Sequence, residues 1–346
     1  MPKITINDIA KKAGVSKTSV SYAFNDPSRL PKETVQRILD IAHEIRYVPN
    51  PVARSMTTGR TGALGVLLPM SIPEIIPSPF LSEFLFGISE VCTEVGFSIM
   101  LVPPIMGSME QAINNAAVDG FITLGVEENT EAMVMLRRRN VPFITVDSDP
   151  ISGVPAINIE DEAGARVVMD YVLKSGHRNL VIIAIKSETP CRYQEYIGTL
   201  RRRMNGYLSA LENFDLDLDD EQVRLLECES TISAGQEIFG QLWNSQKKPT
   251  AVVAMSDVVA IGLISAAKKH GLRIPHELSV VGFDDIPIAS IISPSLTTVS
   301  QPIYGKGELA ATLLIQNIKG KHKDMHHVLP TKLIVRESVC PPAIYS

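Results

Sequence analysis

At 346 residues, the chain is longer than one ordinary domain, so two or three domains are expected. Its net charge of −5 argues against nucleic-acid binding, but the first sixty residues carry +5 and the rest −10, so a basic head precedes an acidic body. The four cysteines lack metal-ligand spacing, and no apolar run reaches the roughly 18–20 residues of a membrane span. Since the N-terminus also lacks an apolar signal core, we expect a soluble, cytoplasmic protein that has no membrane partner. We also expect it to bind neither a metal nor a cofactor.

The head is predicted to contain three helices. Residues 4–25 form two short helices joined by a tight turn: Thr5 is placed to cap the first, Gly14 ends it in a left-handed conformation, and Ser16 caps the second. Pro31 starts the third helix. That helix has one apolar stripe, made of Val35, Ile38, Leu39, Ala42 and Ile45.

The second helix of the head has two unlike faces. Val20 and Phe24, four residues apart, should pack with Val15 and Ile9 into a small core. The opposite face carries small donors and acceptors, as in a helix-turn-helix whose second helix lies in the DNA major groove. Those side chains are Lys17, Thr18, Ser21, Tyr22 and Asn25. For this segment alone, a solvated amphipathic helix is the alternative.

A short helix is expected after the head. Asn50 is a good cap and Pro51 suits a first helical position, but only about six or seven residues follow before Gly59. A helix of this length is marginal alone in water. It could form on DNA, where a second copy and the groove supply packing.

The body, from residue 61, alternates apolar strands with helices. The first series has strands at 63–69, 98–103, 120–124, 142–147 and 156–159, with helices near 82–95, 109–118, 130–139 and 162–175. The second has strands at 180–185, 223–228, 251–254 and 278–283, with helices near 199–213, 232–245, 257–270 and 303–320, and a last strand spans 328–335. Continuous apolar strands separated by helices predict two α/β lobes, each a doubly wound parallel sheet. Ligands of such sheets bind beyond the carboxyl ends of the strands, so the two lobes should share one cleft there.

Polar residues at those strand ends are the candidates for ligand contact. Asp147 and Ser148 end one strand, Asp284 ends another, Asp257 starts a helix after a strand, and Arg203 opens a helix after the long loop 186–198. Each has a plainer alternative. Asp257 could be a plain helix cap and Asp284 could bond only to the backbone, while Arg203 lies in a run of three arginines, which is usually a solvated charge cluster.

The chain closely resembles the lactose-repressor/galactose-repressor family of bacterial transcription regulators, over nearly its whole length. The residues that carry the resemblance are Thr5-x-x-Asp8-Ile9-Ala10, Ala13-Gly14-Val15-Ser16, Tyr47-x-Pro49-Asn50, Ala53-Arg54-Ser55-Met56, Gly282-Phe283-Asp284-Asp285 and Leu296-Thr297-Thr298-Val299-x-Gln301-Pro302. The resemblance implies a periplasmic-binding-protein-like body and a homodimer whose paired heads read a near-palindromic double-stranded DNA operator. The helix at 50–56 would be the family's hinge helix, with Met56 as the wedge that parts a base step in the minor groove.

The resemblance also assigns site residues. The DNA-contacting positions would be Thr5, Ser16, Lys17, Thr18, Ser21, Tyr22, Asn25, Asn50, Ala53, Arg54 and Met56. The effector pocket would be lined by Phe80, Leu81, Asp147, Ser148, Asp161, Arg203, Asp257 and Asp284. Carboxylates, a serine and an arginine around an apolar wall suit a polyhydroxylated ligand, so the effector is predicted to be a sugar or sugar derivative. A nucleobase or another polar metabolite remains open.

We expect a helix-turn-helix domain at 1–48, a hinge and linker at 49–60, and an effector-binding and dimerisation domain at 61–346. Lobe one would comprise 61–162 and 293–325, and lobe two 163–292 and 326–346. His322, His326 and His327 should belong to a polar connection before the last strand, and without an apolar heptad tail a tetramer is not expected. A sugar-binding transport receptor would need an export signal and no basic head, and no motif of an enzyme on this fold is present.

Overall fold

The computed structural model describes residues 4–50, 55, 56, 58–187, 192–218, 221–321 and 325–343. The predicted DNA contacts of Ala53 and Arg54, and the predicted place of His322, lie outside these residues. Two compact units are present: a head that runs to Ala63 and includes Ala117–Asp119, and a body formed by Leu64–Ala116 and the residues from Gly120 onward. Within the described ranges, no helix is both long enough and apolar enough to cross a bilayer.

The three predicted helices of the head are α1 (Ile6–Ala13), α2 (Lys17–Asn25) and α3 (Lys32–Glu44), and the 3-10 turn η1 (Pro27–Arg29), which was not predicted, lies between the last two. Gly14 ends α1 with a φ of +66°, and Ser16 Oγ accepts the amide of Ser19 at 3.0 Å. Thr5 is the N-cap of α1 and forms a capping box with Asp8, whose Oδ2 accepts the Thr5 amide at 2.8 Å and the Thr5 hydroxyl at 2.9 Å. The turn between α1 and α2 is therefore fixed by local residues.

The core of the head is built on Ile9, Val20 and Ile38, all fully buried. The prediction that Leu39 belongs to this core is wrong, because its side chain is 36% exposed and Ile41 packs there instead. Successive residues of a helix are turned by about 100°, so the position after Ile38 faces away while the position three later returns. Burying α3 against α1 and α2 leaves the outer face of α2 in solvent.

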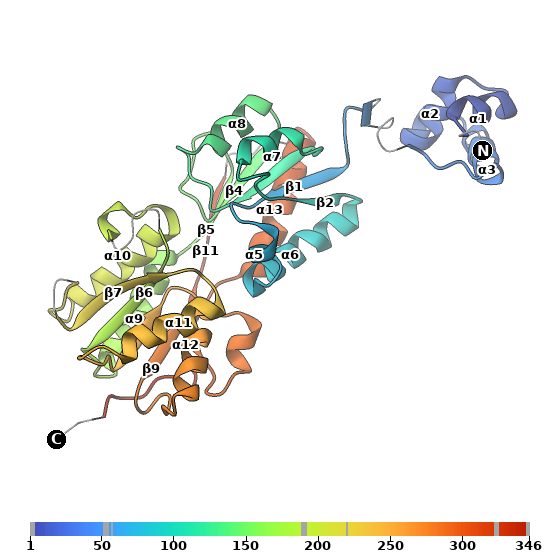
Figure 1. The fold of residues 1–346 in the computed structure, drawn as a ribbon. Coiled ribbons are helices and arrows are strands. Elements are labelled where there is room, and N and C mark those ends of the chain that lie inside the picture. Colours follow the sequence, from blue (N-terminus) through green and yellow to red (C-terminus); the bar gives the residue numbers. More distant parts are fainter. Residues whose placement is uncertain are drawn as a thin grey trace. The chain divides into compact units, whose positions relative to one another are not determined.

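The first lobe has one six-stranded sheet in the order β11-β5-β4-β3-β1-β2 (Figure 1). Its strands are β1 (Ala63–Leu67), β2 (Ser98–Val102), β3 (Gly120–Leu124), β4 (Phe143–Val146), β5 (Ala156–Ile159) and β11 (His326–Leu329). The helices are α5 (Ile72–Ile75), α6 (Pro79–Val95), α7 (Met109–Asn115), α8 (Glu131–Arg139) and α13 (Ile303–Ile318). α6 and α13 pack together on one face of this sheet, and α7 and α8 lie together on the other.

The second lobe repeats this plan with the order β12-β10-β9-β8-β6-β7. Its strands are β6 (Leu180–Ile185), β7 (Val223–Cys228), β8 (Ala251–Ala254), β9 (Ser279–Asp284), β10 (Thr297–Ser300) and β12 (Lys332–Ile334), the last antiparallel to β10. The helices and 3-10 turns are α9 (Asp161–Lys174), η2 (Tyr193–Glu195), α10 (Gly198–Glu212), α11 (Ile232–Trp243), α12 (Asp257–Lys269) and η3 (Pro287–Ser290). Both parallel sheets are thus covered by helices, as the apolar strands predicted.

Strand pairing moves the predicted lobe boundaries. The chain passes between the sheets three times, after β5, after β10 and after β11. Residues 293–300 were expected in lobe one, but β10 pairs with β9 of lobe two. The single strand expected at 328–335 is in fact β11 and β12, one in each sheet, and His326 and His327 lie in β11 instead of a polar connection. No local pattern marks where a strand leaves one sheet for another.

The packing of α13 on α6 depends on two glycines. A Cβ atom at Gly87 would lie 2.1 Å from the carbonyl oxygen of Tyr304, and one at Gly307 would lie 2.1 Å from that of Phe84. The two helix backbones therefore touch directly. This contact places the first turns of α13 beside Phe84 and Gly87 of α6, and from there the Lys306 side chain reaches the ring of Phe80.

Candidate functional site

Candidate residues from several elements gather at the carboxyl ends of the strands. β4 is followed by Asp147, with a φ of +55°, and β9 ends at Asp284, with a φ of +124°. Residues other than glycine rarely adopt such backbone angles, and those that do are often found at functional sites. Arg203 on α10 joins Asp284, and Lys306 on α13 joins Asp147. We call these four, with Gln301 and Phe80, the strand-end cluster.

Arg203 is the best-held side chain of the cluster. Its Nε donates to Asp161 Oδ1 at 2.9 Å and its Nη1 to the carbonyl of Met255 at 2.6 Å, while Nη2 lies 3.7 Å from Asp284 Oδ1. The guanidinium also stacks on Phe283, 3.7 Å from the ring centroid. Burial opposes its charge, yet the carboxylates of Asp161 and Asp284 hold the pKa of Arg203 above its ordinary value. The guanidinium is thus a fixed, fully charged donor.

Asp284 is buried beside that arginine. Burial raises the pKa of this carboxyl to about 6, while the charges of Arg203 and Lys306 and a 2.6 Å bond from Gln301 Nε2 act in the opposite direction. Burial likewise raises the pKa of Tyr207, whose hydroxyl has no hydrogen-bond partner among the described residues. The site therefore contains a carboxyl group with a raised pKa, that of Asp284, and a buried hydroxyl group without a described partner, that of Tyr207.

Lys306 was not singled out from the sequence. Its side chain is fully buried, its Nζ lies 2.5 Å from Asp147 Oδ2, and it sits 5.0 Å from the ring centroid of Phe80. A lysine in the sequence of an apolar helix is normally expected to be exposed to solvent. Only a tertiary contact shows that Lys306 is buried. Gln301 was noted as part of a motif, but was not assigned to the site.

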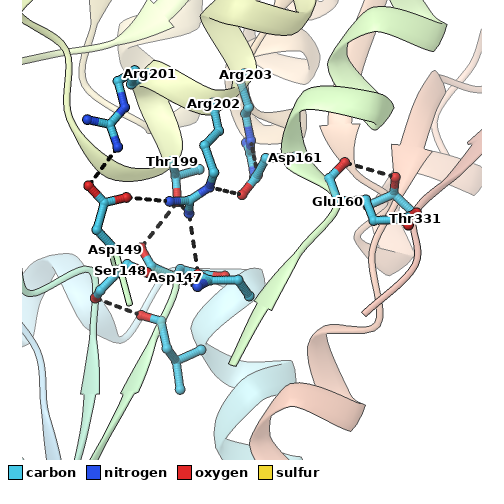
Figure 2. Close-up of polar contacts among 12 residues, drawn as sticks. Asp147, Ser148, Asp149, Glu160, Asp161, Thr199, Arg201, Arg202, Arg203 and Thr331 are labelled. Atoms are coloured by element: carbon cyan, nitrogen blue, oxygen red, sulfur yellow. Dashed lines mark hydrogen bonds and ion pairs between the residues drawn. The ribbon is translucent and has the colours of Figure 1, made fainter. Parts of the chain in front are cut away.

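Neighbouring arginines of α10 join the two lobes, as Figure 2 shows. Arg201 and Arg202 contact the two carboxylate oxygens of Asp149 at 2.7 and 3.0 Å. Arg202 also donates to Asp161 Oδ2 at 3.1 Å, so Asp161 is shared between Arg202 and Arg203. Arg201 and Arg202 therefore form an interlobe contact, whereas Arg203 is held by partners within lobe two. We call Arg201, Arg202 and Asp149 the interlobe clamp.

Other predicted effector contacts face the interior of a lobe. Asp257 accepts Thr298 Oγ1 at 2.5 Å and the amide of Ile286 at 3.0 Å, so both its oxygens are engaged. Ser148 is buried and donates to the carbonyl of Val146 at 3.3 Å, and Leu81 is buried in the hydrophobic core. The predicted effector contacts of these three residues stay predictions.

The predicted DNA-reading side chains lie on the outer face of α2. Lys17 and Thr18 are exposed, whereas Ser21, Tyr22 and Asn25 are half-buried. The guanidinium of Arg29 lies 5.0 Å from the Tyr22 ring centroid and donates to its hydroxyl at 3.2 Å. This partner was missed because it follows seven residues later, outside the helix. Thr5, Ser16 and Asn50 are exposed, and Met56 is 84% exposed.

Comparison with known proteins gives two family matches. Residues 5–50 match the model for bacterial regulatory proteins of the lacI family, and residues 169–339 match a periplasmic binding protein-like domain. The first match covers the three helices of the head. The second covers most of lobe two, together with α13 and β11.

Full-length relatives share the same order of domains. The chain is 29% identical to the HTH-type transcriptional repressor CytR of Escherichia coli K12 and 31% identical to the ribose operon repressor of Halalkalibacterium halodurans, each match covering 96% of both chains. A LacI family transcriptional regulator from Enterococcus faecium, solved with bound ribose, is 26% identical with a TM-score of 0.69, over 81% of this chain and 99% of that one.

Proposed function

This chain belongs to the lacI family of bacterial regulatory proteins, and we propose that it is a DNA-binding transcriptional repressor that a small polar effector controls. It would act as a homodimer on a near-palindromic operator, with two copies of α2 in successive major grooves. The predicted effector is a sugar or sugar derivative. The regulation would rest on binding alone, without a catalytic step.

The outer face of α2 is the observation that carries the DNA-binding half of this proposal. Lys17 and Thr18 are exposed on it, and Tyr22 is held in place by Arg29. A lysine supplies a phosphate or guanine contact, while a threonine and a tyrosine can donate hydrogen bonds to base edges or pack on a thymine methyl group. Tyr22 cannot make the bidentate hydrogen-bonded contact with guanine that an arginine makes.

The strand-end cluster supports the effector half. Arg203, Asp284, Gln301, Lys306 and Asp147 come from both lobes and combine fixed donors with acceptors, as a ligand rich in hydroxyl groups requires. Two relatives point the same way. One is named a ribose operon repressor, and another was solved with bound ribose.

The interlobe clamp provides a path from the effector to the DNA. Asp161 contacts Arg203 of the cluster through one oxygen and Arg202 of the clamp through the other. A ligand that moves Arg203 would alter the contact between Arg202 and Asp149, and with it the angle between the lobes. That angle would set the spacing of the two hinge helices at 50–56, and their folding on DNA. The ligand shifts this balance only by binding one state more tightly.

The proposal is tested by selecting duplexes from a random library with the purified full-length chain. Binding to the best duplex is then measured by fluorescence anisotropy between about 50 and 200 mM salt, where we expect an affinity loss of roughly a thousandfold or more. Sugars, polyols and nucleosides are added to the complex in turn. A protein that prefers no duplex over random competitor would refute DNA recognition, whereas response to nucleosides alone would replace the sugar by the second effector class.

A further inference from the structure

Lys306 is not among the effector-contacting residues predicted from the sequence, but its environment indicates a role in ligand binding. Lysine is among the side chains least often fully buried, because an ammonium loses its hydration inside a protein. Here the Lys306 side chain has no exposed surface, although it lies against Phe80, where an apolar side chain would pack without that penalty. Packing alone therefore does not explain why a charged side chain is buried here, and we infer that the charge has a function.

Its immediate surroundings contain unused hydrogen-bonding capacity. Among the described residues, Asp147 Oδ2 is the one acceptor that the ammonium contacts, at 2.5 Å, although an ammonium has three donors. Asp147 Oδ1 and Gln301 Oε1 are both buried, and no donor from the residues that the structure describes contacts either oxygen. Buried polar groups are almost always satisfied, so unmatched donors and acceptors within one cluster are the expected lining of a ligand site.

The unmatched groups define the chemistry of the ligand. A hydroxyl group can accept from the Lys306 ammonium and donate to Asp147 Oδ1, and a neighbouring hydroxyl can donate to Gln301 Oε1. Since Lys306 and Asp147 neutralise each other, the pair does not favour a charged ligand. The half-buried Phe80 ring beside Lys306 supplies an apolar surface that suits the C–H side of a sugar ring.

We propose that Lys306 contacts the effector directly and, paired with Asp147, determines specificity by reading adjacent hydroxyl groups of a neutral polyol. This inference rests on the proposed function, since it concerns the same effector. It adds a residue that the sequence did not predict and a requirement for vicinal hydroxyl groups.

The test compares Lys306→Met, Asp147→Asn and the double variant with the wild-type chain. The matched control is Lys319→Met, the same substitution at the exposed end of α13. The probes are ribose, glucose, cellobiose and uridine, screened by thermal shift on the wild-type chain, and the best binder is titrated calorimetrically with its monodeoxy analogues. Far-UV circular dichroism checks folding, and the double variant avoids leaving either charge buried alone.

We expect each single variant to bind the probe about 10- to 100-fold more weakly, the double variant no worse than the weaker single variant, and Lys319→Met like wild type. The decisive readout is discrimination: at least one deoxy analogue binds the wild type more weakly than the parent sugar, and that difference disappears in the double variant. A folded double variant with wild-type affinity and discrimination would overturn the inference while leaving the proposed function intact. If no probe binds the wild type, the sugar effector and this inference fail together.

Discussion

The carboxylate of Asp161 links Arg203 of the strand-end cluster to the interlobe clamp, so Asp161→Asn is the most informative single change. Both its oxygens are buried and engaged, one by Arg203 at 2.9 Å and the other by Arg202 at 3.1 Å. Removing one partner of a buried ion pair costs about 3–5 kcal/mol of unfolding free energy. Because Arg203 keeps Asp284 at 3.7 Å, we expect a loss near the lower end, about 3 kcal/mol.

This loss is measured by thermal and urea unfolding at pH 7. For a domain of roughly this size, about 3 kcal/mol lowers Tm by about 6–12 °C. The matched control is Glu162→Gln, the exposed neighbour on α9, expected to cost less than about 0.5 kcal/mol. If Asp161→Asn unfolds like this control, the shared carboxylate is not what holds the two arginines, and the path from Arg203 to Arg202 is refuted.

Three further changes test other parts of the molecule. Met56→Gly should weaken binding to the selected operator far more than to random DNA, measured by anisotropy against competitor; equal losses would argue against a minor-groove wedge. Since burial raises the pKa of Asp284 from 3.8 to about 6, the folded state loses stability as pH rises from about 4 to 6, by up to about 3 kcal/mol. Asp284→Asn should reduce that fall in urea unfolding at a series of pH values, leaving the part that comes from Asp257, whose pKa burial also raises, and an unchanged pH profile would contradict the shift. Gly307→Ala should lower Tm, because its Cβ would lie 2.1 Å from the carbonyl oxygen of Phe84, and a neutral result would contradict the close crossing of α6 and α13.

The elements and the strand-end positions of Asp147 and Asp284 could be predicted because their signals are local. Continuous apolar strands such as Leu180–Ile185 identify covered parallel sheets without any tertiary information. The rule that ligands bind beyond the carboxyl ends of parallel strands then points directly to Asp147 and Asp284. Both lie where the rule places them, with left-handed backbone angles that the sequence does not reveal.

What the sequence did not predict depends on contacts between distant segments. Lys306 reads as a solvated lysine until α13 is packed on α6, and its partner Asp147 is 159 residues away. Arg202 is indistinguishable from its neighbours in a basic run until Asp149 and Asp161 are placed beside it. β10 was assigned to the wrong lobe for the same reason, since only its pairing with β9 shows which sheet it joins.

The ion pairs of the strand-end cluster link the proposed effector specificity to the contact between the two lobes. Arg203 is paired with Asp161 and Asp284, Lys306 with Asp147, so a charged effector would have to displace an existing partner. A neutral polyol can instead use the unmatched Asp147 Oδ1 and Gln301 Oε1, and where one of its hydroxyl groups also reaches Arg203 it competes with Asp161 for that guanidinium. Because Asp161 also holds Arg202, any such competition changes the free energy of the interlobe clamp. Binding and lobe contact are therefore linked reciprocally, so a variant that loosens the clamp must also change effector affinity.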